Sequence, residues 1–401
     1  DDPPPEAAMT KANPVLVRQV DAGQREVANA AWWGFDAADA TECLQAAVRS
    51  GVKKLIVPNL GKPWIVATTI HLVSDQEIHF EPGVEVVASK GKFLGRGEPL
   101  LLAADKQNIT LRGEGATFRM HKEDYTKPPY AKGEWRHALS LVGCTNVKVF
   151  GLMLRDSGGD GLYIGPTNNQ NYCRDIHIKG VACENNYRQG ISVISATDLV
   201  IEDCRLVNTG GTPPGAGIDL EPDAPEERLV NCVIRNCVAE NNAGRGYEIC
   251  PQSMNSGSKP VSIHLDKCVS RKNKLHGIHL CSAQKDPPGG LLRITHFLSE
   301  EDGMAGLSVQ FNPYDAIRIE MEDTVIRDSA QEDSFFAPIY VQGIESDDRP
   351  TGNLHFKRVT IKDDKDRPFF KINDRKGNGL RDITGEIVLE RGGRGLAQRA
   401  G

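Results

Sequence analysis

The chain has 401 residues, of which 39% are hydrophobic, with 40 glycines and a formal net charge of −6. Its apolar runs stay far below the roughly 18 residues that span a bilayer, and its charge is negative, so we expect neither a membrane nor a nucleic-acid partner. The length alone would allow two domains, but one repeat register runs through most of the chain and predicts one.

The two ends differ in composition from the middle. Residues 1–33 form an N-terminal lead segment that starts with two Asp and three Pro and lacks an initiator Met, which is typical of a processed secreted or periplasmic precursor and also of a truncated start. Residues 34–390 carry the repeats. Residues 391–401 are rich in Gly and Arg and predict a flexible tail.

Two segments interrupt the repeats. Residues 42–49 predict an amphipathic helix, with Asp39 or Thr41 as its N-cap, that closes one end of the fold. Residues 119–136 predict a long loop rich in aromatic residues, which either stacks on sugar rings or folds over the repeats as local core.

The repeat unit is a short strand with the pattern Gly-apolar-x-apolar. A leucine-rich repeat would place a helix in each unit, and a propeller blade would need about 40 residues, whereas these units hold roughly three short strands. The pattern therefore predicts an all-β parallel β-helix, in which each coil buries its apolar face against the next. The strands begin at Gly161, Gly190, Gly217, Gly246, Gly277 and Gly306, at intervals of 29, 27, 29, 31 and 29 residues.

Equivalent residues of successive coils form columns. Asn186, Asn242 and Asn273 fall at one repeat position and predict an asparagine ladder. Three of the ten cysteines share another position, so we expect free, buried thiols that fill a column instead of disulfides. These three are Cys204, Cys237 and Cys268.

With these coils, and with the segment from Gly34 to Thr41 before the predicted helix, the chain resembles right-handed parallel β-helix proteins of the pectate-lyase and polygalacturonase type over roughly residues 34–390. The resemblance implies a carbohydrate substrate and a secreted or periplasmic location. Asp160-Gly161 and His276-Gly277 look like the ends of two polygalacturonase motifs, but Gly158-Gly159 replaces the Asn-Thr of the first.

Two other groups are similar in part. The stretch that starts at Gly217 is similar to the region around the Asp-Pro-His-Glu motif of mannuronan C5-epimerases, but Leu220-Glu221-Pro222 replaces Pro-His-Glu, so the expected His is absent. Pectate lyases hold calcium with clustered carboxylates and use a Lys or Arg as base, and Arg245 is the basic residue that this cluster offers.

The outward positions of the repeated strand place ionisable residues together. The third position of each strand gives Tyr163, Ser192, Asp219, Glu248, His279 and Ser308, and the position before each Gly gives His137, Asp160, Gln189, Ala216, Arg245 and His276. Carboxylates that lie close together raise one another's pKa, so one holds a proton while another is ionised. That combination cleaves glycosidic bonds.

We therefore predict catalytic roles for Asp219, Glu221 and Glu248. The class we favour is a glycoside hydrolase that acts without a cofactor. The first alternative is a polysaccharide lyase or C5-epimerase acting on uronic-acid glycans, in which Ca²⁺ would bind the carboxylates; the second is a non-catalytic glycan-binding β-helix. The sequence leaves the sugar and the oligomeric state open. Substrate-binding roles are predicted for Tyr163, Asp160, Arg245, His276 and His279.

Overall fold

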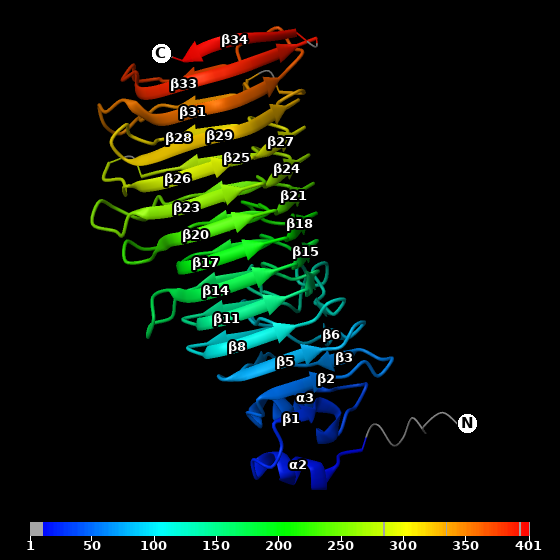
Figure 1. The fold of residues 1–401 in the computed structure, drawn as a ribbon. Helices are drawn as coiled ribbons and strands as arrows, with labels where there is room; N and C mark the ends of the chain where they lie inside the picture. Colours follow the sequence, from blue (N-terminus) through cyan, green and yellow to red (C-terminus); the bar gives the residue numbers. More distant parts are fainter. Residues whose placement is uncertain (1–10, 284, 334, 393, 401) are drawn as a thin grey trace.

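The computed structural model describes residues 11–283, 285–333, 335–392 and 394–400, the last of these ranges by its backbone. The strands stack along one axis, with the N-terminal helices at one end and β34 at the other (Figure 1). Each coil contributes one strand to each of three ladders, two of which join at the long strand β29 into a 23-stranded sheet. Among these strands every pairing is parallel except that of β33 with β34.

The bounds of the strands follow the ladders. The first ladder contains β1 (Val27–Asn29), β2 (Lys54–Val57), β5 (Gln76–Phe80), β8 (Gln107–Arg112), β11 (Thr145–Phe150), β14 (Cys173–Lys179), β17 (Ala196–Glu202), β20 (Leu229–Arg235), β23 (Val261–Asp266), β26 (Gly290–Thr295), β29 (Ile317–Arg327), β31 (Thr351–Lys362), β33 (Leu380–Arg391) and β34 (Arg394–Ala400). The second contains β3 (Trp64–Val66), β6 (Glu85–Ala88), β9 (Thr117–Arg119), β12 (Met153–Arg155), β15 (Ala182–Glu184), β18 (Arg205–Val207), β21 (Val238–Glu240), β24 (Val269–Arg271) and β27 (Leu298–Glu300). The third, an 11-stranded sheet, contains β4 (Ile70–His71), β7 (Leu101–Ala104), β10 (Leu139–Val142), β13 (Leu162–Gly165), β16 (Ile191–Val193), β19 (Ile218–Leu220), β22 (Tyr247–Ile249), β25 (Ile278–Cys281), β28 (Leu307–Gln310), β30 (Ile339–Gln342) and β32 (Phe370–Asn373).

The repeated glycines are required where successive coils touch. A Cβ atom on Gly217 would lie 2.8 Å from the carbonyl oxygen of Gly246, and one on Gly190 would lie 2.5 Å from that of Gly217. Such distances are too short for a side chain, so only Gly lets the backbones approach. The third ladder is thereby in register as predicted, with an inward column of buried side chains. Its central members are Leu162, Ile191, Ile218, Tyr247, Ile278 and Leu307.

The other predicted columns are present with one interruption. Asn242 donates through its backbone N–H and its Nδ2 to Oδ1 of Asn273, at 3.0 and 2.8 Å. Thr209 stands between Asn186 and Asn242 in this column, and its N–H donates to Asn242 Oδ1 at 3.0 Å. All ten cysteines are free, and the three of the predicted thiol column are buried.

The N-terminal end of the stack is covered by helices, as an open end would expose unpaired strand edges. At the N-terminal end lie α2 (Pro14–Asp21), the 3₁₀ helix η1 (Ala30–Trp33) and α3 (Thr41–Arg49). The N-cap of α3 is Ala40 and not Asp39 or Thr41, because the carboxylate of Asp39 instead accepts the Thr41 N–H in the turn before the helix. No described helix has the length and apolarity to cross a membrane.

The sheet extends at both ends beyond the bounds predicted for the β-helix domain, residues 34–390. The sheet begins within the lead segment, because β1 pairs with β2, whereas residues 1–10 of that segment lie outside the described residues. At the other end β34 pairs with β33 where we predicted a flexible tail, so the last coil does not present a free edge over this stretch. Residues 393 and 401 are not described.

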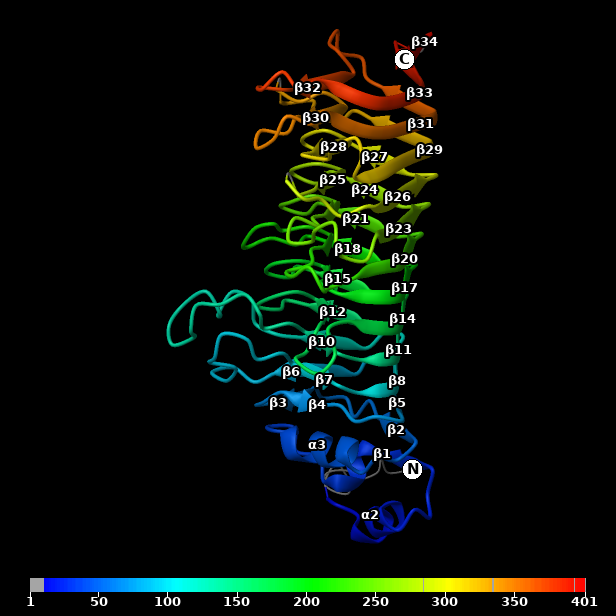
Figure 2. The same ribbon diagram turned by 90° about the vertical axis from the view of Figure 1, so that its left-hand side faces the viewer.

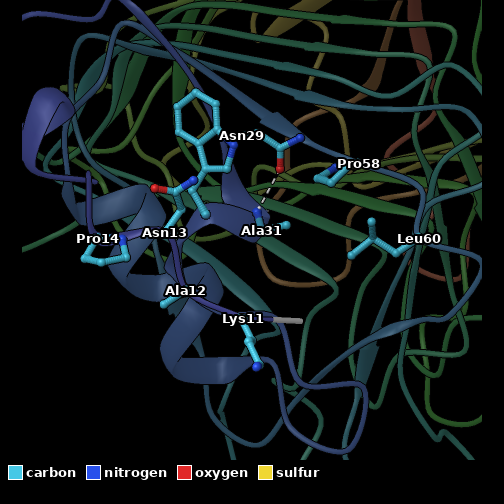
Figure 3. A pocket seen from close by; sticks show the side chains of 9 residues that line it. Lys11, Ala12, Asn13, Pro14, Asn29, Ala31, Pro58 and Leu60 are labelled. Atoms are coloured by element: carbon cyan, nitrogen blue, oxygen red, sulfur yellow. Dashed lines mark hydrogen bonds between the residues drawn. The ribbon is translucent and has the colours of Figure 1, made fainter. Parts of the chain in front are cut away.

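A pocket of about 440 Å³ lies between the start of α2 and the first coil (Figure 3). Asn13, Asn29, Trp32 and Pro58 contribute to its wall, and Lys11 is the charged residue of its lining. None of the acidic residues singled out by the sequence lines it. This pocket is therefore separate from the carboxylates of the third ladder.

Candidate functional site

Two carboxylic acids are neighbours on the outer side of the third ladder. Asp219 in β19 and Glu248 in β22 are register partners on adjacent parallel strands, a spacing of about 4.8 Å between Cα atoms. Ile218 and Leu220 belong to the core, so Asp219 between them points away from it. Both acids are nonetheless covered, with 0% and 4% of their surface exposed. The predicted acidic surface is in fact a buried acidic cluster.

Asp219 is held by Gln189 from the preceding coil. The Gln189 Nε2 donates to Asp219 Oδ2 at 2.7 Å, and the Gln189 Oε1 accepts from the Ala216 N–H at 2.7 Å. The other oxygen, Asp219 Oδ1, is buried, and the Asp219 carboxyl also shares a side-chain hydrogen bond with Glu221. Burial, followed by the charges of Glu221 and Glu248, raises the pKa of Asp219 well above its usual value. The surroundings therefore favour the protonated form of this carboxyl.

Glu248 has different surroundings. Arg245 Nε lies 3.1 Å from Glu248 Oε2, an ion-pair distance, although the angle is not that of a hydrogen bond. His279 Nε2 lies 3.9 Å from Oε1. Burial raises the pKa of Glu248 to about 7, against the opposing charge of Arg245, and the charge of Glu221 adds to the rise. Near neutral pH this acid is thus partly ionised, whereas the surroundings of Asp219 favour its protonated form.

Glu221, the third predicted catalytic acid, follows β19 and keeps 33% of its side chain exposed. It faces Arg188, whose guanidinium lies 3.6 Å from Glu221, 3.7 Å from Asp160 and 3.9 Å from Glu134. Arg188 is itself largely covered, with 14% of its side chain exposed. One arginine thus links the acids of three segments that are distant in sequence.

Sequence reasoning missed Arg188 and the role of Gln189, although a signal was present. Arg188 stands two residues before a repeat glycine, at a position that Gly159 and Gly215 occupy in the neighbouring coils. A charged side chain in a column of glycines is unusual because glycine leaves room that a long side chain can fill. The predicted columns cover other positions of the repeat and therefore omit this exception.

Glu134 reaches the site from the aromatic loop between β9 and β10, which projects from the side of the stack (Figure 2). Arg136 is fully buried, and its guanidinium lies 5.0 Å from the ring of Tyr125 and 5.9 Å from that of Tyr130. These rings therefore hold the loop in place and do not offer a free face. Trp135 remains 40% exposed beside Arg96.

Asp160 and Tyr163 form a second group, two coils before Asp219. His137 stacks on Tyr163 with 4.7 Å between ring centres. Its Nδ1 accepts the Asp160 N–H at 3.0 Å and lies 3.2 Å from Asp160 Oδ2. Burial lowers the pKa of His137 to about 3 and raises that of Asp160 to about 7, so a neutral ring meets a carboxyl that readily holds a proton.

His276 and His279 lie beside the acids as predicted, but they do not carry the charge that binding an anion requires. Their rings stack with 5.2 Å between centres, and each is 2% exposed. Burial lowers the pKa of His276 to about 3 and that of His279 well below its usual value. Neutral rings can bind a sugar by hydrogen bonds but not by charge, so the predicted substrate-binding role of these two residues stays a prediction, and Arg245 supplies the positive charge beside the acids.

Metal binding at the cluster depends on how the acids converge. Within the described ranges, no group of three or more His, Cys, Asp or Glu side chains has the arrangement that holds a metal ion. The expectation of calcium under the lyase alternative stays a prediction for experiment.

Comparison with known proteins fits this architecture. The family model described as "Right handed beta helix region" matches residues 131–287, which include β19 and β22. The chain is a right-handed parallel β-helix protein. The uncharacterized protein YclG of Bacillus subtilis is 28% identical to this β-helix protein over 144 residues, which are 33% of this chain and only 25% of YclG.

Solved structures resemble the β-helix over most of its length. The tailspike protein of E. coli bacteriophage HK620, solved in complex with a pentasaccharide, has a TM-score of 0.66 and 11% identity, and the match covers 93% of this chain and 68% of the tailspike. Pre-mature gene product 12 of bacteriophage phi29 has a TM-score of 0.57 and 13% identity, with 95% and 59% covered. At these identities the likeness shows the fold alone.

Proposed function

We propose that this β-helix protein is a glycoside hydrolase that cleaves a poly- or oligosaccharide, with Asp219 as the general acid and Glu248 as the base or nucleophile. The observation that carries the proposal is the pair of buried, in-register carboxyls with unlike surroundings. Two acids whose environments separate their pKa values are a general basis for acid and base roles.

The chemistry follows from the two environments. Asp219 holds a proton that it can give to the glycosidic oxygen as the bond to the sugar breaks. Glu248, whose anion is stabilised by Arg245 at 3.1 Å, would attack the anomeric carbon or take a proton from the attacking water. Carboxyl groups about 5 to 5.5 Å apart suit the first course and about 6.5 to 9.5 Å the second. The anomer of the first-formed product distinguishes them.

Two features support a sugar as the substrate. Tyr163 is half-buried on the outer column, two strands from Asp219, and its stack with His137 offers a flat aromatic surface of the kind on which sugar rings pack. The HK620 tailspike, similar in fold, was solved with a pentasaccharide. Arg188, at 3.6 Å, would hold Glu221 in place beside the acids.

The test is incubation with a panel of neutral and acidic polysaccharides, read in two ways. A hydrolase releases reducing ends without ultraviolet absorbance, and its activity persists in chelator. Unsaturated, absorbing products that disappear with chelator would instead establish the lyase alternative. Retention of a glycan on the protein without new ends would establish the binding alternative. Asp219→Asn in parallel shows whether any product depends on the site.

A further inference from the structure

The side chain of Gln189 can adopt only one orientation. Its carboxamide is fully buried and held at both ends, by the backbone N–H of Ala216 and by the carboxyl of Asp219, each at 2.7 Å. A backbone N–H only donates, so the atom facing Ala216 must be the carbonyl oxygen of Gln189. The atom facing Asp219 is then the NH₂ group, which has no acceptor capacity.

This orientation decides where Asp219 can carry a proton. The Gln189 NH₂ donates to Oδ2, and the unprotonated oxygen of a carboxylic acid is the better acceptor. The hydrogen bond from Gln189 therefore favours a proton on Oδ1, which is buried.

We propose that Gln189 is a positioning residue that keeps the acidic proton of Asp219 on Oδ1, the oxygen that the Gln189 amide does not contact. The role of this proton in cleaving a sugar rests on the proposed function. The position of the proton on Asp219 rests on the hydrogen bonds alone. The charged groups that act on Asp219 are Glu221, Glu248 and Arg188. Glu221 also shares a side-chain hydrogen bond with Asp219 that favours its protonated form, whereas Gln189 donates to Oδ2 and so disfavours a proton on that oxygen.

Two substitutions distinguish the effect of the Gln189 NH₂ donor from the effect of the volume that the Gln189 side chain fills. Gln189→Glu keeps the shape and the bond from Ala216 but replaces the donor with an acceptor, so the proton moves into a bond shared between Oδ2 and the introduced carboxylate. Gln189→Leu removes the donor without adding an acceptor, and either oxygen of Asp219 can then be protonated. The matched control is Gln45→Glu, since Gln45 is also held at both ends, by the backbone of His71, and lies on α3 at the end of the stack.

The expected result in activity is a difference between the two variants. Gln189→Glu lowers kcat by about 10² to 10⁴ with little change in KM, because general acid catalysis is worth about that much. Gln189→Leu lowers kcat by less than tenfold, and its alkaline pH limb moves up by about 1 to 2 pH units, the usual worth of a hydrogen bond to a charged group. Gln45→Glu lowers the melting temperature but not kcat. Equal losses of kcat in both Gln189 variants would mean that the residue only fills space, and would overturn the inference.

A second readout does not depend on activity. The infrared carbonyl stretch of the protonated Asp219 carboxyl, identified by its loss in Asp219→Asn, is followed against pH in the full chain. We expect its midpoint to rise in both Gln189 variants and to stay in place in Gln45→Glu. An unchanged midpoint would refute the role of Gln189 even if sugars are cleaved. A shifted midpoint without any cleavage would uphold the placing of the proton and reject the hydrolase proposal.

Discussion

The strands of the third ladder carry two columns of side chains, one facing the core and one facing away from it. Inward, Ile218 and its register partners are apolar, and Tyr247, the exception, satisfies its hydroxyl on the carbonyl of Cys237 at 2.8 Å. Outward, Asp219 and Glu248 are buried almost as deeply, yet both are ionisable carboxyls whose pKa values burial raises. A similar degree of burial therefore stabilises the fold in the inner column and destabilises it in the outer column.

The difference separates stability from function. Burying an aliphatic side chain stabilises the coil by roughly 1.5 to 3 kcal/mol, whereas burying a carboxyl group removes it from water and disfavours its charged form. The outer column thus lowers the stability of the fold that the inner column supports. An arrangement that costs free energy of unfolding is best explained by what its acids do.

The largest effect should follow from removing the acids of the outer column. Asp219→Asn and Glu248→Gln should each lower kcat by about 10² to 10⁴, because each removes a proton donor or acceptor from the reaction. The melting temperature should rise for Glu248→Gln, which removes a buried charge, and should change little for Asp219→Asn, which replaces a carboxyl whose protonated form is favoured. Steady-state kinetics on the substrate found in the panel, together with thermal melts, measure both quantities.

The control is the inner column. Ile218→Ala leaves a cavity and should lower the free energy of unfolding by about 2 to 5 kcal/mol, with kcat per folded molecule nearly unchanged. If both acid variants lose less than tenfold in kcat, or if Ile218→Ala loses as much kcat as they do, the two columns do not divide stability and function as we infer.

The sequence predicted the inner column better than the outer one. Repeat spacing determines register, so the partners of Asp219 and the column containing Cys237 followed from counting residues. Burial depends instead on loops of unequal length and on side chains outside the repeat, such as Glu134 and Arg188. His276 is neutral because those loops and side chains bury it, and the repeat register alone does not predict this burial. The proximity of Asp219 and Glu248 could therefore be predicted from the sequence, whereas the charge states of the residues around them could not.

A second test uses pH and the stability of the fold. Burial raises the pKa of Glu248 from 4.5 to about 7, so the folded protein binds this proton more tightly than the unfolded chain. Stability from this group is full below pH 4.5 and is lost as pH rises to about 7. Glu248→Gln lacks this loss, so its free energy of unfolding should exceed that of the wild type by up to ~3 kcal/mol above pH 7 and by little at pH 4. Denaturant unfolding at several pH values measures the gap.

Glu202 on β17 should show the opposite dependence of stability on pH. Burial alone would raise its pKa, but hydrogen bonds from His177, Arg235 and Lys179 lower it to about 2. Its stabilisation is present above pH 4.5 and is lost as pH falls toward 2. Glu202→Gln should therefore be less stable than the wild type at neutral pH, with a gap that closes in acid. If Glu248→Gln shows the same sign as Glu202→Gln, Glu248 is not buried at the expense of stability.

The smallest effect should come from Glu221, the most exposed of the three acids. Its charge raises the pKa of both Asp219 and Glu248, so Glu221→Gln should move both limbs of the pH–rate profile to lower pH. The shift should be less than about one pH unit and should shrink with added salt, because a partly exposed charge is screened. Arg188 keeps Asp160 and Glu134 as partners, so kcat at the new optimum should stay within tenfold. A loss as large as that of Asp219→Asn would instead make Glu221 an acid or nucleophile in its own right, and rescue of the variant by Ca²⁺ would make it a metal ligand, as the lyase alternative requires.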